Sequence, residues 1–335
     1  MGNSTFTNAR TVLLGAQASQ VALPICDHYS GVAVRMQKSL QLQQELAQEF
    51  GGVCVFDVTL DCEDGAPVGG EEEHAHLVAE LAQAAAPGMR VAARFHAVDH
   101  PSFLSDVQIV IGKAAGRLCH VMIPKVDTLD DVNRAVQALD AAGAGDVPVH
   151  ALIESPLAVR NAFEIAAHPR IQSLSFGLMD FVSAHGGAIG EDGMSAQGQF
   201  SHPMVVRAKL EMAAACHAQG KTPSHCVVTE FTDAQRIEQA AHRAASELAY
   251  SRMWSIHPSQ IRPILKAFSP DRAAIDTALA IVEAAQAAQW APISFKGVLH
   301  DRASYRYYWQ ILERAQRTGQ SLPPVAQQWL AGSVQ

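Results

Sequence analysis

Three acidic residues close the segment VFDVTLDCED at positions 55–64: Asp61, Glu63 and Asp64. They follow a run of apolar and β-branched residues, which is typical of a buried strand. Carboxylates this close together repel one another unless water or a positive group neutralises them. This strand end is therefore expected to face a cation.

Polar residues end further strand-like runs along the chain. Arg94 follows VAA, Lys125 follows MIP, Glu154 follows ALI, Asp180 follows FGLM, and His257 lies in SIHP. In an α/β barrel the carboxyl ends of the strands meet at one face, and active sites are built there. Each residue alone is more often a helix cap, a solvated charge or an ion-pair partner. Their shared position favours one common site.

The elements that would position these residues alternate regularly between strand-like runs and helix-like segments. Such alternation over about 260 residues predicts an α/β protein with a (β/α)₈ TIM barrel. The alternative is an open doubly wound sheet, which is weakened because no GxGxxG follows the first run. The strand-like runs are 21–25, 53–61, 90–95, 120–125, 149–154, 173–180, 226–230 and 252–258, and the helix-like segments are 34–50, 74–86, 127–143, 158–168, 204–220 and 233–248.

Length and composition fit one large barrel with an extension. The chain has 335 residues, of which 48% are hydrophobic and 17% are charged, so a sizeable core is expected. We expect a barrel domain over residues 1–268. A helical extension over residues 269–335 is expected to pack on a neighbouring subunit. Such a chain would form a homo-oligomer, and the sequence does not distinguish a trimer from a hexamer.

Charge and cysteine usage exclude several classes of partner. The net charge is −8 and no Lys/Arg cluster is present, so a nucleic-acid surface is not expected. No apolar run reaches the length of a membrane span. The N-terminus lacks the pattern of a secretory signal, and none of the six cysteines forms a CxxC pair. A cytoplasmic location without membrane association is expected.

Glu154 and Asp180 end adjacent strands of the predicted barrel, so their carboxylates should lie close together. Two carboxylates that face one cavity either share a proton or bind a cation. Oxygen ligands without His or Cys suit Mg²⁺ or Mn²⁺. Glu63 and Asp64 would then hold metal-bound waters. Gly177 would permit close approach of the backbone to a ligand.

At these residues the sequence resembles the citrate lyase β-subunit family, within the HpcH/HpaI aldolase group of the phosphoenolpyruvate/pyruvate-binding barrels. The matching elements, which span residues 53–261, are LDCED for D-L-E-D, AARFH for V-R-x-N, IPKV for P-K-V, LIES for I-E-T/S, FGLMD for F-G-x-x-D and SIHPSQI for I-H-P-x-Q-I. The sequence departs from the family where His96 replaces Asn. It also departs where Asp27, His28 and Tyr29 replace a small-residue loop close to the CoA thioester.

The resemblance implies a Mg²⁺-dependent carbon–carbon lyase that cleaves or forms a β-hydroxyacyl thioester such as citryl-CoA or malyl-CoA. Glu154 and Asp180 would ligate Mg²⁺. Arg94 would be catalytic and would bind the 2-oxo acid, with Glu154 and Gly177 also contacting the substrate. Glu63, Asp64 and Lys125 would lie just outside these groups.

The resemblance also assigns a role to the tail. KGVLHD at residues 296–301 resembles the family's G-x-M-I-D element, whose Asp reaches into a neighbouring subunit as the acid or base. Asp301 is therefore the second candidate catalytic residue.

Two other functions are compatible with the same residues. One is a class II pyruvate or oxo-acid aldolase that acts without CoA, although such enzymes usually lack the tail Asp. The other is a barrel that binds a metabolite without turning it over. The sequence does not specify the acyl group, the oxo acid, the use of CoA or the direction of the reaction.

Overall fold

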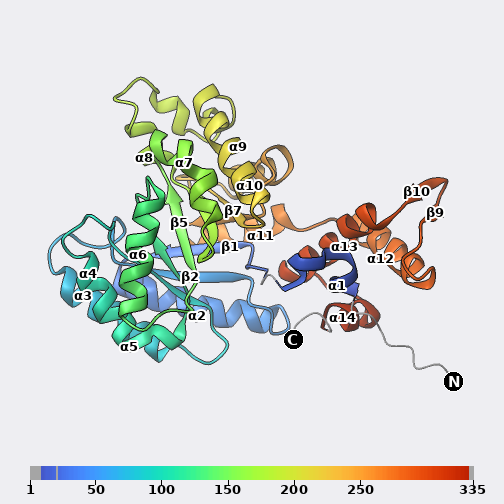
Figure 1. The fold of residues 1–335 in the computed structure, drawn as a ribbon, viewed down its shortest axis with the longest axis horizontal. Coiled ribbons are helices and arrows are strands. Elements are labelled where there is room, and N and C mark those ends of the chain that lie inside the picture. Colours follow the sequence, from blue (N-terminus) through green and yellow to red (C-terminus); the bar gives the residue numbers. More distant parts are fainter. Residues whose placement is uncertain (1–8, 20–21, 332–335) are drawn as a thin grey trace. The chain divides into compact units, whose positions relative to one another are not determined.

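The computed structural model describes residues 9–19 and 22–331 (Figure 1). The chain divides into two compact units. One covers Pro24–Phe268. The other joins the chain up to Leu23 with the chain from Ser269 onward.

Eight parallel strands close into a barrel in the first unit, in the order β1 to β8, with β1 paired to β8. This confirms the predicted (β/α)₈ class and excludes the open sheet. The strands are β1 Cys26–Ser30, β2 Phe56–Asp61, β3 Val91–Arg94, β4 Leu118–Ile123, β5 Val149–Ile153, β6 Ile171–Phe176, β7 Thr222–His225 and β8 Arg252–Ser255.

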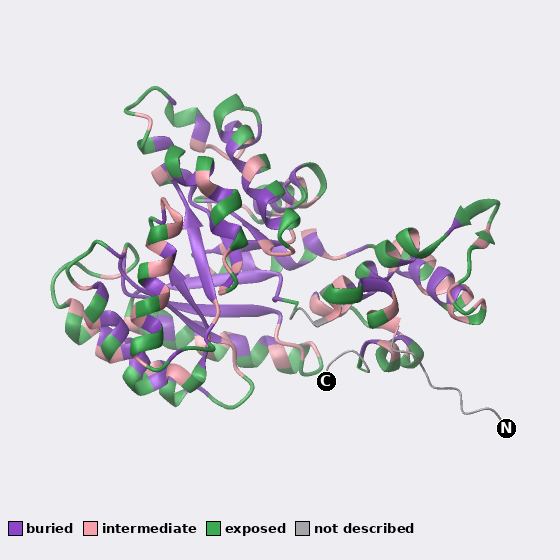
Figure 2. Cartoon of the chain, viewed as in Figure 1, coloured by how far each residue is buried: buried purple, intermediate pink, exposed green. Residues whose placement is uncertain are grey.

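Helices follow the strands and surround the barrel (Figure 1). They are α2 Ala33–Glu49, α3 Glu71–Ala84, α4 Phe103–Asp106, α5 Gly112–Ala114, α6 Leu129–Ala141, α7 Pro156–Ala167, α8 Leu178–Ser183, α9 Pro203–Ala218, α10 Ala234–Leu248 and α11 Ile261–Phe268. Their starts carry the expected chemistry: Thr128 caps α6 in a capping box with Asp131, and Ser155 caps α7 ahead of Pro156. Figure 2 shows that the strands are buried while the helices are buried on one side only.

Two of the predicted strands are misplaced. Val21 lies outside the described residues, and residues 22–25 form no strand, because the first strand begins at Cys26. The seventh strand is Thr222–His225, whereas the sequence had indicated residues 226–230. Both real strands are polar, reading CDHYS and TPSH, and every residue of them except Thr222 is buried.

The barrel interior accepts this polarity because charges pair inside it. Arg252 of β8 lies 3.0 Å from Asp27 Oδ2 and 2.6 Å from Asp57 Oδ2, and Arg90 lies 2.5 Å from Asp57 Oδ1. Burial alone would raise the pKa of both carboxyls, but Arg252 beside Asp27, and Arg90 and Arg252 beside Asp57, hold both pKa values at about 2. Because β1 is polar, a run of apolar residues does not reveal it in the sequence.

The second unit contains the N-terminal helix and the tail. Its helices are α1 Ala9–Leu14, α12 Arg272–Ala287, α13 Arg302–Arg317 and α14 Pro324–Ala331, and an antiparallel pair is formed by β9 Ile293–Phe295 and β10 Val298–His300. Trp309, Tyr305 and Leu13 belong to its own buried apolar cluster. Within residues 9–19 and 22–331, no helix has the length and apolar content needed to cross a membrane.

Candidate active site

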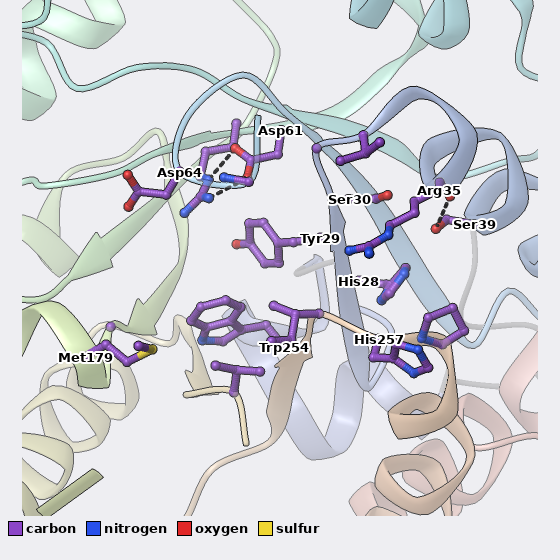
Figure 3. Close-up of a pocket in the computed structure, with 18 of the residues that line it drawn as sticks. His28, Tyr29, Ser30, Arg35, Ser39, Asp61, Asp64, Met179, Trp254 and His257 are labelled. Carbon is purple, nitrogen blue, oxygen red and sulfur yellow. Dashed lines mark hydrogen bonds and ion pairs between the residues drawn. The ribbon is translucent and has the colours of Figure 1, made fainter. Parts of the chain in front are cut away.

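A cavity of about 560 Å³ lies at the carboxyl end of the barrel strands (Figure 3). Its volume is within the range of small-molecule sites. Five of the predicted site residues line it: Asp64, Arg94, Glu154, Gly177 and Asp180. The structure therefore brings together side chains from β2, β3, β5 and β6, or from the residue or loop directly after them.

Glu154 and Asp180 interact electrostatically across this cavity. Glu154 is 7% exposed and follows β5, while Asp180 lies in the first turn of α8, directly after β6. Burial and the neighbouring Asp180 carboxylate raise the pKa of Glu154 to about 8, against partial opposition from the Lys125 N–H and Arg94. A buried carboxyl facing a second carboxylate binds a proton or a cation. This oxygen-only pair fits a hard divalent cation.

The backbone around Glu154 is shaped to hold its side chain. The Lys125 N–H donates to Glu154 Oε1 at 2.6 Å, and Lys125 has φ +51°, in the left-handed region that side chains other than Gly rarely adopt. A Cβ on Gly177 would lie 2.4 Å from Glu154 Oε2. Gly177 therefore makes room for this side chain as well as lining the cavity.

Arg94 is oriented by Asp61, a residue for which the sequence suggested no specific role. Asp61 Oδ1 and Oδ2 accept from Arg94 Nε and Nη2 at 2.6 and 2.5 Å, and Asp61 also accepts from the N–H groups of Glu63 and Gly65, both at 2.9 Å. Asp61 and Arg94 are Cα partners in the β2–β3 ladder. Since guanidinium has five N–H donors, Arg94 keeps donors for a ligand.

Glu63, Asp64 and Lys125 form the edge of the site. The ammonium group of Lys125 donates to Glu63 and lies 3.6 Å from Asp64, while Arg94 Nη1 lies 3.3 Å from Glu63. Glu63 and Lys125 are not among the residues that line the cavity. Arg94 and Lys125 therefore neutralise most of the charge of Asp61, Glu63 and Asp64.

Two residues from the motifs act as helix caps. His257 accepts from the Ser259 N–H at 3.2 Å, its ring stacks on Phe231 with the ring centres 4.6 Å apart, and it also lines the cavity. Asp301 belongs to the second unit and caps α13 by accepting from the N–H groups of Ala303 and Ser304 at 3.0 and 3.3 Å.

The cavity also has an outer part that the sequence motifs did not indicate. Arg35 and Lys38 line it from the start of α2, exposed and one turn apart, and neither forms an ion pair among the described residues. Val32, the N-cap of α2, supplies no side-chain cap. The Ser30 hydroxyl is buried there without a hydrogen-bond partner in the described chain. A helix N-terminus with two cations favours an anion. In the sequence, the three-residue spacing between Arg35 and Lys38, shortly after the first strand, could have revealed this pair.

Two other groups of ligand-type residues lie inside the barrel: Asp27, His120 and His150, and Asp57, Cys119 and His120. Arg252 already pairs with both carboxylates. A dication there would meet this guanidinium at close range, so these groups are structural.

Comparison with known proteins agrees with the fold. The model of the HpcH/HpaI aldolase/citrate lyase family matches residues 42–258. An L-malyl-CoA/beta-methylmalyl-CoA lyase of Cereibacter sphaeroides is 32% identical over 241 residues, covering 67% of this chain and 75% of that protein.

Solved structures extend the similarity along the chain. A citrate lyase from Burkholderia xenovorans is 47% identical, with a TM-score of 0.79 over 93% of this chain and 97% of that one. A Mycobacterium tuberculosis protein, solved with magnesium, acetoacetate and coenzyme A, shares the fold at 21% identity and a TM-score of 0.67, over 88% of this chain and 98% of that one. The family match covers more than half of the chain and includes Arg94, Glu154 and Asp180. The chain therefore belongs to the HpcH/HpaI aldolase/citrate lyase family.

Proposed function

We propose that this protein is a Mg²⁺-dependent carbon–carbon lyase that cleaves or forms a β-hydroxyacyl thioester, with a 2-oxo acid and an acyl thioester as the other side of the reaction. The observation that carries the proposal is the convergence of Glu154, Asp180 and Arg94 on one cavity. The 32% identical relative is named as a malyl-CoA lyase, which agrees with this class of substrate.

Glu154 and Asp180 would hold the Mg²⁺. When bound, the ion would polarise the hydroxyl and the adjacent carboxylate of the substrate and orient the bond to be broken. Arg94, fixed by Asp61, would donate to the oxo-acid carboxylate and stabilise negative charge there. Neither metal ligand would be the base, because a bound cation lowers the pKa of both carboxyl groups and makes them weak proton acceptors.

In the cleavage direction, a water molecule acting as base would take the hydroxyl proton, and the electron pair left on the oxygen would form the carbonyl of the oxo acid. The electrons of the broken carbon–carbon bond pass to the α-carbon of the thioester. Asp301, supplied by a neighbouring subunit, would protonate that carbon. In the condensation direction the same carboxylate would remove this proton.

The outer part of the cavity supports the use of a CoA thioester. Arg35, Lys38 and the N-terminus of α2 offer positive charge beside a cavity that continues to the metal ligands. The phosphates of CoA would suit this position, whereas a free oxo acid with one carboxylate, such as pyruvate, has no second anionic group to place there. This favours the thioester lyase over the aldolase that acts without CoA.

Turnover tests the proposal directly. The full chain is incubated with malyl-CoA or citryl-CoA and Mg²⁺, and acyl-CoA and oxo-acid products are measured with and without EDTA. We expect cleavage that EDTA stops and Mg²⁺ restores. Activity confined to free hydroxy-oxo acids would identify an aldolase. Mg²⁺-dependent binding of these compounds without turnover would identify a binding protein.

The Arg35→Glu/Lys38→Glu variant should discriminate between the two parts of the cavity. We expect KM for the CoA thioester to rise about tenfold or more, with the effect shrinking at high salt, because two exposed cations are lost. The Kd of a free oxo acid should not change. Arg160→Glu/Arg207→Glu on α7 and α9 makes the same change of charge away from the cavity and serves as the control. An equal effect of both variants would contradict a local phosphate contact.

Mg²⁺ affinity should rise with pH. Since the pKa of Glu154 is about 8 without a cation, Mg²⁺ must displace a proton below that pH. We expect the Kd for Mg²⁺, measured by calorimetry, to rise by up to about tenfold for each pH unit below 8. Proton release on binding should appear as a dependence of the binding enthalpy on the ionisation enthalpy of the buffer. Without a cation, the free energy of unfolding should fall as the pH rises from 4.5, the ordinary pKa of a Glu side chain, towards 8. Affinity independent of pH between 6 and 8 would contradict this site.

A further inference from the structure

Tyr29 has an unusual position in the barrel. It lies on β1, is 4% exposed and packs with Met122 and Leu152 inside the barrel. Trp254 meets its ring edge-on at 4.9 Å, and the Arg94 guanidinium carbon lies 5.3 Å from its ring centre. Tyr29 also lines the cavity, and Figure 3 shows it between Asp61 and Trp254. Its ring therefore forms part of the wall beside Arg94.

The hydroxyl of Tyr29 has no hydrogen-bond partner among the described residues and is closed off from solvent. The other buried tyrosines are paired. Tyr250 Oη donates to the Lys209 carbonyl at 3.0 Å, and Tyr305 Oη donates to the Ala291 carbonyl at 2.7 Å. A buried hydroxyl without a partner destabilises the folded chain. Phenylalanine would fill the same space without this cost, so packing does not account for the hydroxyl.

The chemistry of the hydroxyl is that of a donor. Burial raises the pKa of Tyr29 well above its ordinary value, so the phenol keeps its proton. It would meet an acceptor such as a carboxylate or carbonyl oxygen. The ligand expected beside Arg94 has both.

We propose that Tyr29 is a substrate-binding residue whose hydroxyl donates to a carboxylate or carbonyl oxygen of the 2-oxo acid held by Arg94. This inference rests on the proposed function. Because Oη is closed off in this structure, side chains around the cavity must shift when the acid binds. Tyr29 would then select acids with an acceptor oxygen on this side of the cavity.

The test compares Tyr29→Phe with Tyr250→Phe and with the unaltered chain. Kd for oxaloacetate and for pyruvate is measured by calorimetry with saturating Mg²⁺, and Tm is measured without ligand. For Tyr29→Phe we expect oxaloacetate to bind about tenfold to a hundredfold more weakly, because a hydrogen bond to a charged group is lost. Its Tm without ligand should stay the same or rise. Tyr250→Phe should lower Tm, because its partner Lys209 carbonyl loses a donor, and should leave Kd unchanged.

The outcomes separate the two levels of the argument. Weaker binding of oxaloacetate alone would place the contact at the carboxylate that pyruvate lacks, and weaker binding of both acids would place it at their shared groups. Unchanged Kd values in Tyr29→Phe, or a fall in its Tm, would overturn the role of Tyr29 while the lyase proposal stands. If the unaltered chain binds neither acid, this inference fails, and the proposed function fails with it only if the chain also turns over neither malyl-CoA nor citryl-CoA.

Discussion

Glu154→Gln should lower carbon–carbon lyase activity by at least about a thousandfold, even with excess Mg²⁺, because Gln is neutral and binds a hard dication poorly. The fold should remain intact. Burial and Asp180 already favour the protonated, neutral form of Glu154 at neutral pH, and Gln resembles that form. The gain in Tm that Mg²⁺ gives the unaltered chain should be lost in the variant.

The matched control is Glu164→Gln. Glu164 is exposed on α7, ten positions along the chain, and receives the same chemical change. It should keep full activity and the full Tm response to Mg²⁺. If Glu154→Gln kept its activity and its response to Mg²⁺, the assignment of the metal to the Glu154–Asp180 pair would be wrong.

The position of this pair could be predicted because it depends on strand phase alone. Glu154 and Asp180 each come at or just after the end of an apolar strand, β5 and β6, and adjacent parallel strands bring such ends together. No further geometry is needed. Gly177 is predicted from the sequence as a point where the backbone approaches a ligand, and the structure shows that its lack of a Cβ also leaves room for the Glu154 side chain.

The pairing of Arg94 could not be predicted, because it depends on register. Three acids stand in the LDCED segment, and the sequence does not say which one faces Arg94. The β2–β3 ladder aligns Asp61 with Arg94, and this alignment gives Asp61 the two-point contact. Glu63 and Asp64 lie beyond the strand end and pair with Lys125, and Glu63 also lies 3.3 Å from Arg94 Nη1.

The errors at β1 and β7 have one physical cause. Apolar runs predict strands when the barrel interior is apolar, but here the interior carries ion pairs and hydroxyls. Asp27 is acceptable on β1 because Arg252, more than two hundred residues later, lies beside it and the Thr59 hydroxyl donates to it at 2.6 Å. A contact over that distance leaves no local signal.

The proposed role of Asp301 depends on a neighbouring subunit, whereas Glu154 and Asp180 lie in one barrel. Asp301 caps α13 through Oδ1 and is exposed. Asp301→Asn should preserve this helix, because Asn caps as well as Asp. It should nevertheless remove activity, because an amide cannot transfer the proton. Circular dichroism and Tm would show that the fold is retained.

Mixing inactive variants tests whether Asp301 acts across subunits. Asp301→Asn and Asp180→Asn are denatured and refolded together in equal amounts. The mixture should recover about a quarter of the unaltered activity. Half of the subunits keep both Glu154 and Asp180, and half of their neighbours keep Asp301. Asp180→Asn mixed with Glu154→Gln is the control. It should recover nothing, because both changes affect the same barrel. Recovery in the control alone, or none in the first mixture despite proven mixed oligomers, would show that Asp301 does not act in a neighbouring subunit.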